Sequence, residues 1–115
     1  MPLLTLHDPV VAKCYHDQGL WRDEGLYDHA ARHARTIPDD NALRDSCRRL
    51  TWRQLELWAR AIANALAQSG LKLGDRVAMA LSNRAESVAV MLACSRNGYI
   101  CSPSLHRNYT SLEML

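Results

Sequence analysis

The sequence predicts an α/β fold in which helices and short apolar strands alternate over the second part of the chain. Residues 51–70 repeat apolar side chains at three- and four-residue spacing, as an amphipathic helix does. Residues 77–81 and 99–102 are short apolar runs, and a second helical segment between them ends at Gly98. Because a helix that joins two strands usually pairs them in parallel, we expect a parallel sheet.

A short helix is predicted near the start of the chain. Asp8 is its expected N-cap, Pro9 occupies the first turn, and Gly19 ends it. The apolar side chains of Leu20 and Trp21 follow at once. We expect them to pack on the body of the protein.

A second helix and a small hairpin come next. The helix runs from about residue 26 to residue 35, and Pro38 ends it. Two polar-edged strands, residues 41–45 and 48–51, flank a tight turn at residues 46–47. Strands this short and this close are typical of a β-hairpin.

The two later helices carry end signals in their sequences. Thr51 and Gln54 form a capping box at the start of the long helix, and Gly70 is its expected left-handed C-terminal cap. Asn83 is the expected N-cap of the next helix, with Glu86 as its capping-box partner.

The two later strands and the last helix indicate whether the α/β domain is complete. Residues 77–81 are uniformly apolar, which predicts a parallel strand covered on both faces. Pro103 ends the next strand, and a last helix begins near Thr110 with no cap before Leu115. The short sheet would leave open edges. We therefore expect an incomplete α/β domain, with residues 1–40 as an N-terminal helical segment and 41–115 as the start of the domain.

Composition excludes several functional classes. The chain has 115 residues, and 14 basic against 12 acidic side chains give a net charge of +2. These charges are interleaved, which argues against nucleic acid or a membrane as partner. The longest apolar run, residues 88–94, falls short of the ~20 residues that a membrane helix needs. The four cysteines form no C-x-x-C pair, and a reducing cytoplasm is the expected location.

Some polar residues invite a ligand-binding interpretation. Asn83 and Glu86 open a helix after a strand, the position that phosphate loops use, but no glycine-rich motif accompanies them. We interpret both residues as helix caps. His29 and His33 share a helix face at metal-ligand spacing, yet a third ligand is missing, and a solvated face is the preferred interpretation. Cys14 and His16 likewise have no further metal-ligand motif near them in the sequence.

Other residues could be nucleophiles or contacts. Cys94 and Cys101 lie in apolar runs, so we interpret them as buried small side chains. Trp52 and Trp58 could form a stacking platform, but their helical spacing favours core packing. His106 and Arg107 follow Pro103 in a loop that could border a bound ligand.

Four motifs occur in order along the chain. They are residues 21–24 (WRDE), 42–45 (ALRD) with 50–55 (LTWRQL), 70–78 (GLKLGDRVA), and 83–86 (NRAE) leading to 98–103 (GYICSP). In this order and separation, they resemble the start of the adenylate-forming enzymes, which include acyl-CoA synthetases and aryl-acid AMP ligases. The resemblance spans residues 20–115, and residues 97–106 are most similar to bacterial acyl-CoA synthetases.

The resemblance implies an ATP-dependent, AMP-forming carboxylic acid–CoA ligase that uses ATP, Mg²⁺ and CoA. The family's phosphate loop, rich in Ser, Thr and Gly and ending in Pro-Lys-Gly, has no counterpart, and the only lysines are Lys13 and Lys72. We therefore assign no catalytic, cofactor-binding or metal residue, and we expect an inactive N-terminal scaffold fragment. The alternatives are a stand-alone interaction or regulatory module of the same fold and an unrelated small α/β binding protein.

Overall fold

The computed structural model describes residues 7–82 and 84–104. Its elements, in chain order, are α1 (Pro9–Asp17), α2 (Leu26–Thr36), β1 (Asn41–Arg44), β2 (Arg49–Thr51), α3 (Trp52–Gln68), β3 (Arg76–Met79), α4 (Ala85–Asn97) and β4 (Ile100–Pro103). The predicted order of helices, hairpin and strands is confirmed. The helix predicted near Thr110, like His106 and Arg107, lies outside the described residues.

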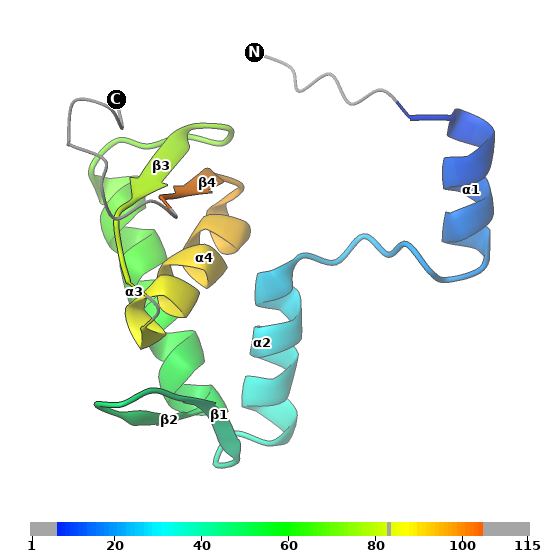
Figure 1. Ribbon diagram of the computed structural model, residues 1–115. Coiled ribbons are helices and arrows are strands. Elements are labelled where there is room, and N and C mark those ends of the chain that lie inside the picture. The colour runs from blue at the N-terminus through cyan, green and yellow to red at the C-terminus, as the bar shows by residue number, and fades with distance from the viewer. Residues whose placement is uncertain (1–6, 83, 105–115) are drawn as a thin grey trace.

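Three helices form the body of the molecule. Figure 1 shows α2, α3 and α4 lying together, with the β1–β2 hairpin near one end of α3 and the β3–β4 pair near the other. The core cluster at their junction consists of Ala30, Leu55, Ala59, Ala89 and Leu92. Ala59 and Ala89 are both 0% exposed. Because alanine has the smallest side chain after glycine, these positions let the helix backbones approach closely, while the larger Leu55 fills the remaining space.

Each pair of strands forms its own sheet. The hairpin strands β1 and β2 pair antiparallel, and β3 pairs with β4 in parallel, with Val77 opposite Cys101. The predicted hairpin and parallel pairing are confirmed. The prediction that the first parallel strand is covered on both faces is wrong for the described residues, because exposed Ala78 alternates with half-buried Val77 and buried Met79. One face of β3 packs on the body, and the other is open.

The helix ends follow the sequence signals in most places. Asp8 caps α1 by accepting a hydrogen bond from the Val10 backbone N–H over 2.8 Å. The Thr51 hydroxyl accepts from Gln54 N–H over 3.3 Å, and the Gln54 side chain accepts from Thr51 N–H over 2.9 Å. The predicted capping box of α3 is therefore confirmed. Gly70, just past the end of α3, has a φ of +102°, as its predicted left-handed role requires.

Helix α1 stands apart from the other helices, at the end of an extended segment (Figure 1). The prediction that Leu20 and Trp21 pack on the body is wrong: they are 66% and 45% exposed. The Trp21 ring instead lies 5.1 Å from the Tyr15 ring and 5.9 Å from the His16 ring of α1. Backbone hydrogen bonds from Leu20 and Trp21 to the Tyr15 carbonyl fold the chain back on its own helix.

The described helices are too short or too polar to cross a membrane: none of those in residues 7–82 and 84–104 combines the length and apolarity that a membrane span needs.

Candidate functional site

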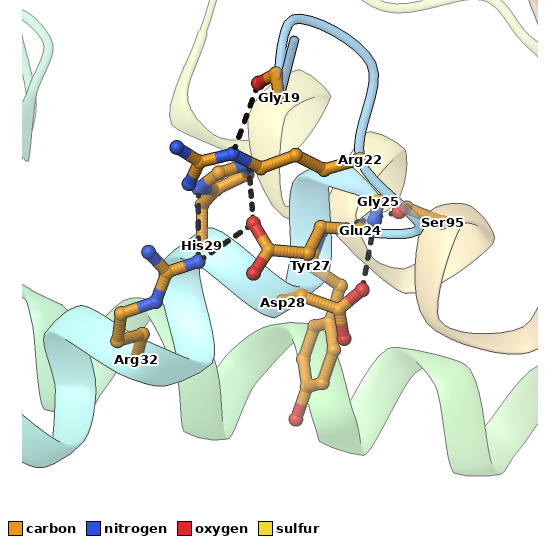
Figure 2. Close-up of polar contacts among 9 residues, drawn as sticks. All are labelled: Gly19, Arg22, Glu24, Gly25, Tyr27, Asp28, His29, Arg32 and Ser95. Atoms are coloured by element: carbon orange, nitrogen blue, oxygen red, sulfur yellow. Dashed lines mark hydrogen bonds and ion pairs between the residues drawn. The ribbon is translucent and has the colours of Figure 1, made fainter. Parts of the chain in front are cut away.

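A cluster of charged side chains joins the linker after α1 to the start of α2 (Figure 2). The Glu24 carboxylate accepts a hydrogen bond from Arg32 over 2.9 Å and lies 3.6 Å from the His29 ring. Arg22 donates to the Gly19 carbonyl over 3.4 Å. Glu24, His29 and Arg22 line an open cleft of about 700 Å³ together with Trp21. The Glu24–Arg32 ion pair thus holds the linker onto α2.

The two histidines at metal-ligand spacing have separate partners. His29 faces Glu24 and Arg32, whereas the His33 ring lies 4.6 Å from the Trp52 ring at an angle of 42°. Within the part of the chain that the structure describes, no three His, Cys, Asp or Glu side chains gather as metal ligands.

A buried carboxylate connects α2 to α3. Glu56 is 5% exposed, and its two oxygens accept hydrogen bonds from Arg60 over 2.7 and 2.8 Å. The Tyr27 hydroxyl donates to the same carboxylate. Burial raises the pKa of Glu56, but the hydrogen bonds from Tyr27 and Arg60 outweigh it and hold that pKa below its ordinary value. Glu56 is therefore a fully paired anion inside the body.

Tyr27 extends this connection to the third helix. Its backbone N–H donates to the Ser95 hydroxyl over 3.1 Å, and the Arg96 guanidinium carbon lies 5.5 Å from the centre of its ring. Figure 2 shows Ser95 beside Gly25, where the linker enters α2, and the Tyr27 ring pointing away from it. An open cleft of about 570 Å³ beside Tyr27 and Glu56 is also bordered by Arg35 and Arg53. Tyr27 thus joins α2 to α3 through Glu56 and to α4 through Ser95 and Arg96.

A second carboxylate joins the hairpin to α4. One oxygen of Asp45 accepts hydrogen bonds from the Cys47 and Arg48 backbone N–H groups, each over 2.8 Å. The other oxygen accepts from the Ala85 N–H over 3.0 Å. The bond from Ala85, followed by those from Cys47 and Arg48, lowers the pKa of Asp45. Beside it, Arg48 forms an ion pair of 3.1 Å with Glu86.

The capping box predicted at Asn83 and Glu86 is wrong. The N-cap of α4 is Arg84, whose side chain makes no capping hydrogen bond. Asn83 itself lies outside the described residues. The physical reason is a tertiary contact. The Asp45 carboxylate of the hairpin accepts the hydrogen bond from the first N–H of α4, and Glu86 forms an ion pair with Arg48. A cap supplied across such a distance in sequence leaves no local pattern to find.

The carboxyl ends of β3 and β4 meet at one edge of their sheet, because the strands are parallel. Met79 is opposite Pro103, and the Ser104 N–H donates to the Met79 carbonyl over 2.8 Å. Ligands of open α/β sheets bind outside this edge. The connection from β3 to α4, residues 80–84, has neither glycine nor lysine. Its sequence therefore carries neither the glycine-rich segment nor the lysine of a phosphate-loop motif.

The remaining candidates are packing residues. Trp52 and Trp58 pack against the core cluster, which confirms the packing interpretation, and the Arg48 guanidinium carbon lies 5.1 Å from the centre of the Trp58 ring. Cys94 is 1% exposed, and burial together with the neighbouring Cys101 thiol raises the pKa of Cys94 to about 11. The buried interpretation of Cys94 is confirmed, and Cys101 is half-buried.

Cys14 and His16, near the start of the chain, have local partners. Cys14 is exposed and accepts a hydrogen bond from Gln18 over 3.0 Å, while His16 contacts Trp21.

The sequence analysis did not identify the two carboxylates that organise the body, Asp45 and Glu56. For Glu56 a signal was present, since an acid followed four residues later by Arg60 adjoins the apolar stripe of α3. Asp45 had no comparable signal.

The family model of AMP-binding enzymes matches residues 30–114. The chain therefore belongs to the AMP-binding enzyme family, and the predicted resemblance is confirmed.

Several individual members of this family are similar to the chain in sequence or structure. The chain is 35% identical over 92 residues to the medium-chain fatty-acid–CoA ligase of Escherichia coli, covering 79% of this chain and 16% of that protein. It is 39% identical over 84 residues to a salicylyl-CoA synthase / salicylate adenylyltransferase of a Streptomyces species, covering 73% and 15%. The apo structure of MbtA from Mycobacterium smegmatis superposes with a TM-score of 0.81 at 32% identity, covering 90% of this chain and 20% of that one. The chain thus spans about a sixth of the length of these curated relatives.

Proposed function

We propose that this chain is the N-terminal scaffold fragment of an ATP-dependent, AMP-forming carboxylic acid–CoA ligase. The match of residues 30–114 to AMP-binding enzymes is the observation that carries the proposal. Relatives named as medium-chain fatty-acid–CoA ligase, acetyl-coenzyme A synthetase and feruloyl-CoA synthase support a carboxylic acid as the substrate class.

The proposed reaction has two steps. A carboxylate attacks the α-phosphate of ATP, which gives an acyl adenylate and releases pyrophosphate. The thiol of CoA then attacks the acyl carbon and releases AMP. Both steps need groups that offset developing negative charge. Among the described residues no three His, Cys, Asp or Glu side chains gather as metal ligands, and the sequence of residues 80–84 carries no glycine-rich phosphate motif, so we assign Mg²⁺ and ATP no site in this part of the chain.

We therefore assign this fragment a structural role. The Tyr27–Glu56 and Asp45–Ala85 contacts hold the hairpin, α2 and α4 in one arrangement around α3. That arrangement sets where the carboxyl edge of β3 and β4 lies. We assign no catalytic or cofactor-binding role to its side chains. The division at residues 40 and 41 stays a prediction, and a cytoplasmic location is part of the proposal.

A chimera tests this role directly. The segment of the E. coli medium-chain fatty-acid–CoA ligase that aligns with this chain is replaced by this chain, and acid-dependent pyrophosphate release is measured. The proposal expects release to persist. A matched chimera carrying Leu55→Asp, at a position 3% exposed, should lose both folding and release. A parent chimera that melts cooperatively but releases no pyrophosphate with any acid in a panel contradicts the proposal.

A further inference from the structure

The open cleft beside Tyr27 and Glu56 lies between α2 and α3 and has a volume of about 570 Å³. We call it the α2–α3 groove. Its α2 wall has the small side chains of Ala31 and Ala34, and its α3 wall has Leu57, which is 51% exposed. One exposed leucine is ordinary on a protein surface, but this one lines a concave site beside two alanines. The groove therefore has room for an apolar side chain from another molecule.

Two arginines from different helices line one end of this groove. Arg35 lies in the last turn of α2 and Arg53 in the first turn of α3. Both residues are exposed. The Arg53 backbone N–H donates to the Pro38 carbonyl over 3.1 Å, which holds the start of α3 against the chain that leaves α2. The two guanidinium groups therefore face the same open space.

The acidic side chains that line the groove do not neutralise these two arginines. Asp28 lies in the first turn of α2, at the end opposite Arg35, and accepts a hydrogen bond from the Gly25 N–H over 2.7 Å. Glu56 is 5% exposed and accepts a hydrogen bond from Arg60 over 2.8 Å. The end of the groove where α2 stops and α3 starts is therefore positively charged, and a carboxylate is the group that complements it.

The present partner of Arg53 is a weakly held carboxylate. Its guanidinium lies 3.3 Å from Asp39, and the Arg53 and Asp39 side chains are 58% and 80% exposed, respectively. An ion pair this exposed contributes little, so a carboxylate from a partner can replace Asp39 at small cost. Among the described residues, no ion pair involves Arg35. The planar guanidinium of arginine suits such a partner because it matches a carboxylate with two parallel hydrogen bonds.

We propose that the α2–α3 groove is a docking surface for an acidic amphipathic helix of a partner protein. Arg53 and Leu57 are four residues apart on α3, so they are neighbours on one face of that helix. The partner helix carries a carboxylate and a large apolar side chain at the same spacing, and a second carboxylate that faces Arg35. Its apolar side chain covers Leu57 while its carboxylates pair with the arginines. This surface goes beyond the proposed scaffold role and does not depend on it.

Two synthetic peptides test the proposal with the 115-residue chain. In the first peptide, glutamates and leucines recur at three- and four-residue spacing, so that both fall on one helix face. The second has the same composition, with the leucines distributed around the helix. Fluorescence anisotropy at about 0.15 M salt gives each Kd. We expect saturable binding of the first peptide and about tenfold weaker binding of the second, because scattered leucines cannot cover the groove together with paired glutamates.

Variants of the chain separate the groove from its general charge. Arg35→Ala/Arg53→Ala should weaken binding of the first peptide about tenfold or more. Leu57→Ala should weaken it about threefold, because less apolar surface is covered. The matched control is Lys72→Ala/Arg76→Ala, which removes the same charge from exposed positions outside the groove and should change the Kd less than about twofold.

Asp39→Ala gives an outcome of the opposite sign. It removes the carboxylate that competes for Arg53, so binding of the first peptide should tighten about twofold. Equal weakening by the two double variants would reduce the effect to net charge and overturn the proposal. Equal binding of the two peptides would also overturn it, as would a chain that melts cooperatively and binds neither peptide.

Discussion

The Asp45 carboxylate in the hairpin turn accepts a hydrogen bond over 3.0 Å from the backbone N–H of Ala85, 40 positions further along the chain. This N–H opens α4 and would otherwise lack a partner within the helix. One side chain therefore fixes both a turn and the start of a helix from a different part of the domain.

Asp45→Ala should lower the melting temperature by about 5 °C, because losing an N-cap acceptor destabilises a helix start and the turn loses two further bonds. Asp45→Asn keeps an acceptor oxygen and should have a smaller effect. The matched control is Asp39→Ala, which removes an ion pair with Arg53 whose side chains are 80% and 58% exposed, respectively. Thermal melts followed by circular dichroism check the order Asp45→Ala, Asp45→Asn, Asp39→Ala. Equal melting temperatures for the two alanine variants would contradict this role.

Acid should destabilise the chain through the same carboxylates. The folded-state pKa values of Asp45 and Glu56 lie below their ordinary values of 3.8 and 4.5. The unfolded chain therefore binds protons first, so this stability is present above those values and is lost as the pH falls through the folded ones. We expect a nearly constant melting temperature from neutral pH to about pH 5 and a fall below it. An Asp45→Asn/Glu56→Gln double variant should show a shallower fall in melts recorded across this range, and a parallel fall would count against the assignment.

Tyr27→Phe should destabilise the chain by about 1–3 kcal/mol, because it removes a donor from a buried carboxylate and leaves the rest of the ring in place. Urea unfolding gives the free energy directly. Tyr15→Phe is the control, since Tyr15 is 37% exposed on α1 and its ring packs on Trp21. An effect of Tyr27→Phe no larger than that of Tyr15→Phe would show that the Tyr27–Glu56 contact does not stabilise the body.

Gly98→Ala should cost about 1–2 kcal/mol, because a side chain is disfavoured at the positive φ of +72°. A Cβ at this position would also lie 2.2 Å from the Leu73 side-chain end, but Leu73 is 83% exposed and can turn away. We therefore expect Leu73→Ala to rescue little of the loss. Urea unfolding of the single and double variants separates the two causes, and full rescue by Leu73→Ala would assign the cost to the clash instead.

Local sequence signals predicted the parts of the fold that depend on neighbouring residues. The Thr51–Gln54 capping box, the left-handed Gly70 and the helix end at Gly98 each depend on residues within a few positions, so the sequence displays them. The exposed face of β3 was not predictable from its apolar composition, since a run of apolar residues fits a covered strand as well as a half-covered one.

Contacts that leave no local sequence pattern account for the other misses. In the sequence, Asp45 is an ordinary turn residue. Its hydrogen bond from the Ala85 N–H forms only in the folded structure. Large aromatic side chains are usually buried, which favoured Trp21 on the body, but Tyr15 and His16 of the preceding helix α1 provide its contacts. The absence of catalytic residues among the candidates stays a prediction that requires measurement.

The central claim is that this chain is a scaffold part of an AMP-forming ligase with no nucleotide site of its own. Calorimetric titration of the folded 115-residue chain with Mg-ATP tests it most directly, with a full-length relative titrated in parallel as the control. The account predicts no saturable heat with this chain up to about 1 mM ATP, which corresponds to a binding free energy weaker than about −4 kcal/mol. A saturable isotherm with a Kd below about 1 mM would contradict it.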